Sequence, residues 1–298
     1  MSDVRIAGLA GSAIADNYLA ETYGLARVED VGGVPVYRNE KGELFVGGYK
    51  GIYSVVLSGS EQLLPVLEEW RKNHVFVRYS FSANSNFFRS KRLNLVLELA
   101  PGMRIEDRLL KYARNVRKHV RRAADSSLEY KIEPPPDAWY RLYSAHCNRL
   151  GSVPRPAESF KALERAFGSM VLCVVACDAD TPVGVLYCLR TDTYLTLSLI
   201  ASDVAYRDVR VDNGLYDMAV QYAIREGIRF VDFGPTMSAD ASHWDVKVGY
   251  GAEVFYFADK AFMPLSHKIN EQVWYLMYRI KRRIRTTWNR FVMYLKQL

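Results

Sequence analysis

A single lysine, Lys247, lies between two apolar segments that are predicted to be strands of a buried sheet. Residues 230–257 are FVDFGPTMSADASHWDVKVGYGAEVFYF, so the lysine follows a polar loop and precedes a Gly-Tyr-Gly-Ala turn. Aminolysis of an ester or thioester passes through a tetrahedral intermediate with a negative oxygen, which a nearby cation stabilises. Lys247 is our candidate for that cation. The alternative is a lysine whose stem covers a hairpin while its ammonium group stays in water.

Asp232 is the second candidate for this chemistry. It ends the first apolar segment beside Gly234, a common position for active-site residues in mixed sheets. Its carboxylate could orient the incoming amine or accept its proton. The alternative is a carboxylate that caps the turn after the strand.

Several aromatic residues could line the same cleft, although such residues are more often found in a core or at its rim. They are Tyr206, Trp244, Tyr250 and Tyr256. The three tyrosines are also candidate proton donors, and Tyr206 is the one that we assign to catalysis. Trp244 and its neighbour His243 fall in the loop predicted before the lysine, where they could contact substrate, but a lone histidine in a loop usually faces solvent.

Residues 103–124, MRIEDRLLKYARNVRKHVRRAA, have helical periodicity and a dense basic face. The spacing i, i+3, i+4, i+7 and i+8 places these cations on one face: Arg114, Arg117, Lys118, Arg121 and Arg122. No acidic residue lies between Arg108 and Asp125. Such a surface suits the phosphates of a UDP-linked sugar, a lipid pyrophosphate or tRNA. The alternative is a charged face that only meets solvent.

The elements that position these candidates are predicted to form mixed sheets with helices packed on them. In the first hundred residues we expect strands at 34–39, 44–48, 52–59, 75–81 and 93–100, and a helix at 60–73. Farther along we expect strands at 128–134, 170–178, 181–190, 193–202, 228–234 and 251–258, and helices at 137–151, 158–168 and 212–227. Asp212 or Asn213 is the predicted cap of the last helix and Gly227 its end.

The order of elements over residues 165–260 resembles the core of the GNAT acyltransferase fold. Within that superfamily it is most similar to the FemAB-type branch, which includes the aminoacyl-tRNA-dependent enzymes that build peptidoglycan cross-bridges. Three stretches carry the resemblance: ARNVRKHVRRA at 113–123, YDMAVQYAIREGIRFVDFG at 216–234, and VKVGYGA at 246–252. The first resembles the family's Arg-rich helix, the second ends on its Asp-Phe-Gly, and the third resembles its Phe-Lys-x-x-Phe-Gly-Ala.

This resemblance implies that Lys247 neutralises the donor's phosphate or the developing negative charge. Two departures from the family patterns bear on the donor. The family's Phe before the lysine is Val246 here. Acetyl-CoA enzymes carry Gln/Arg-x-x-Gly-x-Gly/Ala before the central helix, where backbone N–H groups hold the pyrophosphate. The matching stretch, YRDVRVDNGLYD, has one glycine, so Asn213 and Gly214 are the candidate donor-binding positions and CoA is the less favoured donor.

Composition limits the remaining choices. The chain has 298 residues, a net charge of +7 and four cysteines without metal-ligand spacing, which we expect to be buried and reduced. No signal peptide or long apolar run is present, so we expect a cytoplasmic protein. The tail at 265–298 mixes aromatic and basic residues. It fits a helix that lies on anionic lipid at the inner face of the membrane, one that meets RNA, or one that docks on the domain.

The sequence therefore predicts an α/β protein with two GNAT-like halves, mixed β-sheets flanked by helices, and a basic amphipathic C-terminal helix. The expected division is 1–101, 102–261 and 262–298. The expected activity is transfer of an aminoacyl group from aminoacyl-tRNA to an amine of a phosphorylated cell-envelope or glycan precursor, without a further cofactor or metal. One alternative is an N-acyltransferase that uses acyl-CoA or acyl-carrier protein on an amino sugar. Another is a non-catalytic module that binds nucleic acid or membrane.

Overall fold

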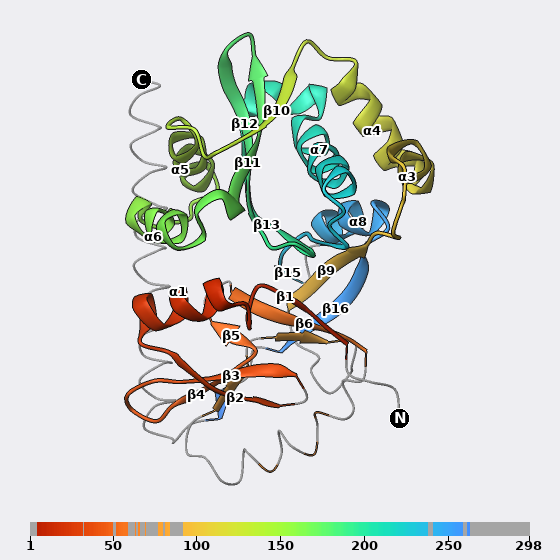
Figure 1. Cartoon of the computed structure of the whole chain (residues 1–298). Helices are drawn as coiled ribbons and strands as arrows, with labels where there is room; N and C mark the ends of the chain where they lie inside the picture. Colours follow the sequence, from red (N-terminus) through yellow and green to blue (C-terminus); the bar gives the residue numbers. More distant parts are fainter. Residues whose placement is uncertain are drawn as a thin grey trace.

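The computed structural model describes residues 5–31, 33–49, 52–58, 77–79, 81–83, 92–237, 241–258 and 261–262, and three helical residues at 63, 65 and 69. Its main feature is a large mixed sheet that runs through the molecule (Figure 1). The strand order is β1 (Arg5–Gly8), β6 (Ile52–Ser58), β8 (Phe81–Ala83), β16 (Glu253–Ala258), β9 (Arg92–Glu98), β14 (Phe230–Asp232), β13 (Tyr194–Ser202), β12 (Thr181–Arg190), β11 (Val171–Asp178) and β10 (Glu129–Glu133). Two short strands join its side: β15 (Thr236–Met237) pairs with β9, and β5 (Gly48–Tyr49) pairs with β6.

A smaller sheet belongs to the N-terminal part of the molecule, in the lower half of Figure 1. Its order is β17 (Ala261–Phe262), β7 (Val77–Tyr79), β4 (Leu44–Val46), β3 (Val34–Arg38) and β2 (Ala26–Val31). The mixed α/β architecture with sheets flanked by helices is therefore as predicted from the sequence.

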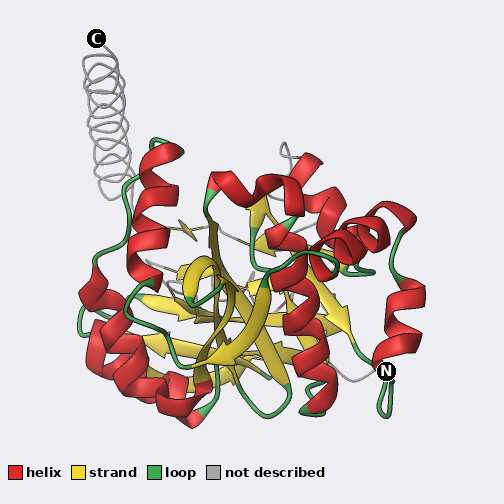
Figure 2. Cartoon of the chain, turned by 90° about the horizontal axis from the view of Figure 1, so that it is seen from above, coloured by secondary structure: helices red, strands yellow, loops and turns green. Residues whose placement is uncertain are grey.

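Helices cover both faces of the large sheet, as Figure 2 shows. Elements on one side are α1 (Ala13–Tyr23), α5 (Trp139–Arg149) and α6 (Ala157–Phe167); those on the other are α3 (Ile105–Lys111), α4 (Arg114–Ala124), α7 (Val211–Arg225) and α8 (Ala241–Gly249). Strand β11 shows why both faces are covered. Its residues alternate, with Cys173 and Val175 packed towards α5 and α6 while Leu172 and Val174 face α7. All four cysteines are buried and unpaired, as expected.

The sheet opens where two parallel strands part. Strands β13 and β14 pair over only three residues each, ending with Thr196 opposite Asp232. Beyond that point β13 continues along β12, whereas the chain after β14 turns at Gly234, whose φ is 72°. The turn leads to β15, which pairs with β9 instead. An open end between parallel strands is a usual place for a ligand in such sheets.

Most predicted strands and helices are present, and the predicted helix at 60–73 lies mostly outside the described residues. Three expectations are wrong. The helix predicted over 103–124 is two helices, because Tyr112 is extended and the Ala113 N–H donates to the Gly249 carbonyl (2.8 Å). The polar loop predicted before Lys247 is helix α8. The cap of α7 is Arg210, with a left-handed φ of 62°, so Asp212 and Asn213 lie inside the helix.

The predicted boundary at residue 101 falls between β9 and α3. Strand β9 lies between β16 and β14, and β6 and β1 continue the same sheet on the far side. Residues from both predicted halves therefore share one sheet, and the division into domains stays a prediction. The predicted C-terminal helix lies outside the described residues.

Candidate functional site

Lys247 lies on helix α8 and is 8% exposed. Its ammonium nitrogen donates to the Phe233 carbonyl at 2.7 Å, to Thr236 Oγ1 at 2.6 Å and, at 3.4 Å, to the Gly234 carbonyl. The lysine therefore holds the turn that leaves β14 at the open end of the sheet. A buried ammonium group needs such partners, because an isolated charge in the interior is costly. The alternative of a lysine that extends into water does not describe this geometry.

Asp232 is fully buried at the end of β14. Its Oδ2 accepts hydrogen bonds from the Tyr53 and Tyr194 hydroxyls, both at 2.7 Å, and its Oδ1 accepts one from the Gly234 N–H at 2.8 Å. Burial raises the pKa of Asp232 above its usual value, while these donors, together with Asn94, act in the opposite direction. The bond to Gly234 is the turn cap that the sequence suggested as an alternative.

Tyr53 is one of the residues in this network that sequence analysis missed, together with Tyr194 and Asn94. It comes from β6 in the N-terminal part of the chain, 179 residues before its partner Asp232. Its hydroxyl also lies 3.4 Å from Asn94 Oδ1 on β9. In the sequence it is one aromatic residue in an apolar strand, and no local pattern distinguishes it from a core residue.

The predicted aromatic residues do not gather in one place. Tyr250 is buried directly after α8, and its hydroxyl donates to the Asn213 carbonyl at 3.0 Å. Trp244 is half-buried on α8, with its indole Nε1 unpartnered among the described residues. Tyr256 is half-buried on β16, and His243 also belongs to α8. Trp244 thus lies on the lysine-bearing helix and Tyr250 directly after it, whereas Tyr256 belongs to the sheet.

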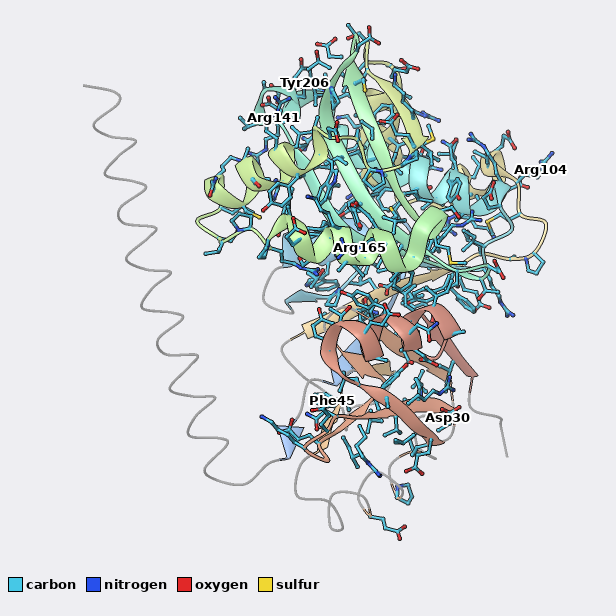
Figure 3. The ribbon with its side chains drawn as sticks, turned by 60° about the vertical axis from the view of Figure 1, so that its left-hand side comes forward. Asp30, Phe45, Arg104, Arg141, Arg165 and Tyr206 are labelled. Carbon is cyan, nitrogen blue, oxygen red and sulfur yellow. The ribbon has the colours of Figure 1, made fainter. Side chains whose placement is uncertain are left out.

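Tyr206 lies far from the lysine. It belongs to the short 3₁₀ helix η4 (Val204–Val209), which follows the end of β13 opposite to the end that pairs with Asp232. The six steps along the strand from Thr196 to Ser202 span roughly 20 Å. Its hydroxyl donates to Asp178 Oδ2 at 2.7 Å, and Figure 3 shows it at the outer end of the molecule. The structure does not bring Tyr206 together with Lys247 and Asp232.

The start of α7 is closed by protein side chains. Asn213 is turned inwards, with its amide nitrogen 3.3 Å from the Tyr250 hydroxyl. Gly214 faces Tyr130 of β10 so closely that an added Cβ would lie 2.3 Å from the Tyr130 hydroxyl oxygen. The glycine is therefore explained by close packing of the helix against a ring. Neither residue presents an open backbone cradle of the kind that holds a pyrophosphate.

This packing makes a prediction about stability. Replacing Gly214 by alanine is expected to lower the free energy of unfolding by about 1–3 kcal/mol, because the added methyl group overpacks the contact with Tyr130. Urea unfolding of the Gly214→Ala, Tyr130→Ala and double variants measures the coupling between the two positions. If the glycine is needed for packing against the ring, Gly214→Ala lowers the free energy of unfolding much less in the Tyr130→Ala background than in the wild type. An equal cost in both backgrounds contradicts the explanation.

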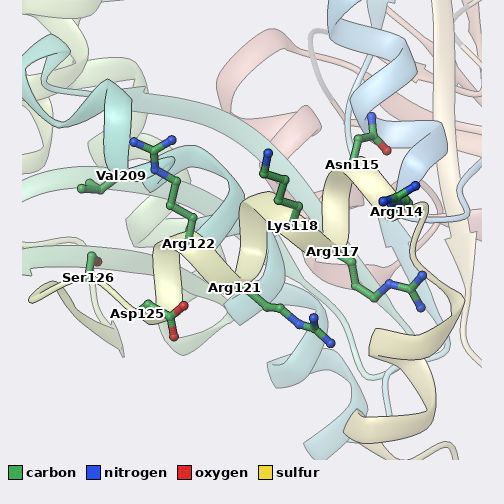
Figure 4. A pocket seen from close by; sticks show the side chains of 9 residues that line it. All are labelled: Arg114, Asn115, Arg117, Lys118, Arg121, Arg122, Asp125, Ser126 and Val209. Atoms are coloured by element: carbon green, nitrogen blue, oxygen red, sulfur yellow. The ribbon is translucent and has the colours of Figure 1, made fainter.

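The basic face of α4 lines a groove of about 1280 Å³ (Figure 4). Its lining includes the five cations Arg114, Arg117, Lys118, Arg121 and Arg122, as well as Asp125 and Val209. The helix presents this face outwards because its apolar residues, among them Val116 and Val120, are buried. Among the described residues none of the five cations has a carboxylate partner in an ion pair. Burial lowers the pKa of His119, and the positive charges of Arg210, Lys118 and Arg122 near its ring lower it further.

The groove is joined to the lysine-bearing helix. The Ala113 N–H, one residue before α4, bonds the Gly249 carbonyl at the end of α8. Gly249 also packs directly on Val116, where an added Cβ would lie 2.5 Å from a Val116 methyl carbon. The buried Arg108 guanidinium donates to the Tyr250 carbonyl and so binds the same helix end. Helix α4, which carries the predicted basic residues, is thus joined by direct contacts to the end of helix α8, which carries Lys247.

A second, smaller cavity of about 100 Å³ lies at the open end of the sheet. Tyr53, the partner of Asp232, lines it, and so does Gly234, whose carbonyl contacts Lys247. The cavity therefore touches both candidate networks. Among the described residues, no group of His, Cys, Asp and Glu side chains is placed to hold a metal ion.

Comparison with known proteins shows which folds the chain is similar to. A family model for the acetyltransferase (GNAT) domain matches residues 111–244. The crystal structure of FemX has a TM-score of 0.59 and 11% identity, covering 91% of this chain and 95% of that chain. The C-terminal domain of a protein described as a lysylphosphatidylglycerol synthetase from Agrobacterium fabrum has a TM-score of 0.49 and 11% identity, covering 82% and 87%. A tandem GNAT protein from the clavulanic acid biosynthesis pathway has a TM-score of 0.42 and 12% identity, covering 78% and 79%. No curated protein matches the chain in sequence.

Residues 111–244 match a GNAT acetyltransferase domain, which supports an acyltransferase. The fold shared with FemX extends over 91% of the chain. The resemblance inferred from the basic helix, the Asp-Phe-Gly and the lysine motif is therefore confirmed at the level of the fold.

Proposed function

We propose that the protein transfers an aminoacyl group from aminoacyl-tRNA to an amine of a cell-envelope or glycan precursor. The observation that carries this proposal is the basic groove along α4, tethered to the helix that bears Lys247. A groove of about 1280 Å³ lined by five cations has the size and charge for several phosphates of a polyanion. The resemblance to FemAB-type transferases supports the same donor.

In the proposed reaction the amine nitrogen attacks the carbonyl carbon of the aminoacyl ester. The carbonyl becomes a tetrahedral oxyanion, the C–O bond to the ribose breaks, and the amine proton passes to the released ribose hydroxyl. Lys247 supplies the positive charge beside the oxyanion, exchanging its long 3.4 Å contact with the Gly234 carbonyl for the new negative oxygen. Asp232 accepts hydrogen bonds from the Gly234 N–H and the Tyr53 hydroxyl, and so fixes the turn and the ring that lie beside this position.

An acyl-CoA donor is the second candidate, because the matching family model is one of acetyltransferases. Two features weigh against it. The start of α7 has a single glycine, and the Tyr130 ring packs directly against that glycine, where a pyrophosphate would have to bind. Asn213 at the same place bonds Tyr250. An acyl donor with one pyrophosphate also does not need a groove as long as that on α4.

Binding of bulk tRNA as a function of salt tests the proposal. The affinity of the wild type is expected to fall steeply with salt, because phosphate binding releases counterions. Replacing Arg114, Arg117, Lys118 and Arg121 together by glutamine is expected to reduce the slope of log K against log salt by roughly 3, since each lost phosphate contact removes about 0.7–0.9. Fluorescence anisotropy with labelled tRNA measures both quantities.

A matched control removes the same charge from the opposite face of the sheet. The variant Arg141→Gln, Arg149→Gln, Lys161→Gln, Arg165→Gln changes exposed residues of α5 and α6, two of which are labelled in Figure 3. It should leave the salt slope close to that of the wild type. Equal losses in both variants would mean that net charge, and not the groove, binds the tRNA. Micromolar binding of CoA in calorimetry, with transfer from acyl-CoA and none from aminoacyl-tRNA, would establish the second candidate.

Membrane contact through residues 265–298 remains part of the proposal. In the described part of the chain no helix has the length and apolar character needed to cross a bilayer. The tail itself lies outside the described residues.

A further inference from the structure

The small cavity at the open end of the sheet has a mixed lining. Its apolar wall comes from α6, β6 and β12 and consists of Ile52, Phe160, Leu163 and Leu189. Tyr53 and Tyr187 add rings, and Gly234 and Pro235 close it where the chain leaves β14. Its volume of about 100 Å³ equals the share of roughly three water molecules at ~30 Å³ each. Only a short chemical group fits such a space.

Two buried hydroxyls in this lining are poorly satisfied. Thr196 Oγ1 makes no hydrogen bond, although Thr196 is only 3% exposed. The hydroxyl of Tyr187, a residue that is 1% exposed, has no partner at hydrogen-bond distance, but the Glu164 carboxyl lies near enough to add to the rise in the Tyr187 pKa that burial causes. Buried polar atoms are normally satisfied, so these two hydroxyls indicate a ligand that completes them.

The charged member of the lining is the Arg155 guanidinium. It lies over the Phe160 ring, 4.7 Å from the ring centroid, and has no carboxylate partner among the described residues. The backbone of Arg155 is held in place, because its N–H donates to the Tyr143 hydroxyl and its carbonyl accepts from Tyr140. A guanidinium group with fixed position and free N–H donors matches the two oxygens of a carboxylate.

We propose that this cavity is the subsite for the carboxylate of the amine acceptor. Arg155 forms the ion pair with the carboxylate, and the Thr196 and Tyr187 hydroxyls donate to its oxygens. The apolar wall encloses a stem of one or two carbon atoms. The acceptor class is therefore a small amino acid, or a peptide end, that carries a free carboxylate close to its reactive amine.

The position of the cavity agrees with this assignment. Gly234 lines the cavity, and its carbonyl oxygen lies 3.4 Å from the Lys247 nitrogen. An amine joined to the bound carboxylate by a short stem therefore reaches the place where the oxyanion forms. The identification of the ligand as an acceptor rests on the proposed function, whereas the carboxylate subsite rests on Arg155, Thr196 and Tyr187.

Binding of propionate to the full chain tests the subsite directly. Propionamide has the same shape without the charge, and inorganic phosphate has charge without the planar group or the stem. Ligand-observed NMR is expected to show saturable binding of propionate at millimolar concentration, and at least tenfold weaker binding of propionamide and phosphate. Equal binding of propionate and propionamide, or preferential binding of phosphate, would overturn the proposal.

Two variants locate the binding. Arg155→Gln is expected to weaken propionate binding about tenfold or more, since a charge-assisted pair is lost. Arg165→Gln, the same change on an exposed residue of α6, should leave binding unchanged. Thr196→Val keeps the shape of the side chain and removes an unpartnered hydroxyl, so its melting temperature should equal or exceed that of the wild type while propionate binds several-fold more weakly. Propionate binding as strong as that of the wild type in either cavity variant overturns the assignment.

These measurements need no donor and no turnover. Propionate binding without aminoacyl transfer to any carboxylate-bearing amine would leave the subsite in place and reject the proposed function. Aminoacyl transfer without propionate binding at the cavity would support the proposed function and reject the subsite.

Discussion

Replacing Lys247 by methionine is expected to lower turnover at least a hundredfold. Removal of one preorganised donor to a tetrahedral oxyanion typically reduces turnover by about 10²–10³. Methionine retains the length and apolar stem of the side chain but removes the charge. Transfer of a labelled aminoacyl group from aminoacyl-tRNA to an amine acceptor, measured at saturating donor, provides the readout.

The same change also affects folding, and the two effects can be separated. The Phe233 carbonyl and Thr236 Oγ1 lose their partner, so the free energy of unfolding should fall by about 1–3 kcal/mol. Circular dichroism at the assay temperature establishes that the variant is folded. Lys161→Met, at an exposed position on α6, is the matched control and should retain wild-type turnover. Turnover of folded Lys247→Met within threefold of the wild type would remove the lysine from the mechanism.

Replacing Asp232 by alanine is expected to lower the free energy of unfolding by about 3 kcal/mol. The change leaves three buried donors unsatisfied: the Tyr53 and Tyr194 hydroxyls and the Gly234 N–H. Each such group costs about 1–3 kcal/mol, and the release of a buried charge offsets part of the sum. Urea unfolding measures the difference. A loss below about 1 kcal/mol would show that the three donors find other partners.

The loss should depend on pH in a defined direction. The folded-state pKa of Asp232 is raised above its unfolded value, chiefly by burial, so the folded state binds more protons at this site than the unfolded state. The stabilising contribution of protonation is complete below the unfolded pKa of about 3.8 and is lost as pH rises through the folded pKa. The wild type should therefore exceed Asp232→Ala by more at pH 5 than at pH 8. Asp192→Ala, on the turn between β12 and β13, is the control.

Regular apolar patterns were enough to predict much of the fold. Strands β11, β12 and β13 are long, apolar and bounded by turn residues, so tertiary contacts only confirm what their local sequence favours. Helix α8 was missed because it has only nine residues and no pattern that distinguishes it from a polar loop. The break between α3 and α4 was missed for a different reason. It depends on the bond from Ala113 to Gly249, which joins distant parts of the chain.

The candidate site could be predicted only where chemistry shows in the residue type. Lys247, Asp232 and the arginines of α4 stand out because a lone cation, a strand-end carboxylate and a basic helix are unusual features of a sequence. Tyr53 and Thr196 do not stand out, since their importance arises from the partners that the fold brings to them or leaves absent. Local sequence also gave no sign that Gly214 serves a ring on another strand.

The place of β9 in the large sheet affects how the chain folds. Because β9 is hydrogen-bonded on one side to β14 and on the other to β16, the strand that carries Asp232 would present a bare edge until β9 is in position. Pairing of these distant segments has to overcome the entropy of closing long loops, which slows folding of such topologies. A fragment limited to residues 111–244 lacks β9 and would expose that edge to self-association, so the strand that carries Asp232 and the earlier strand β9 belong to one folding unit.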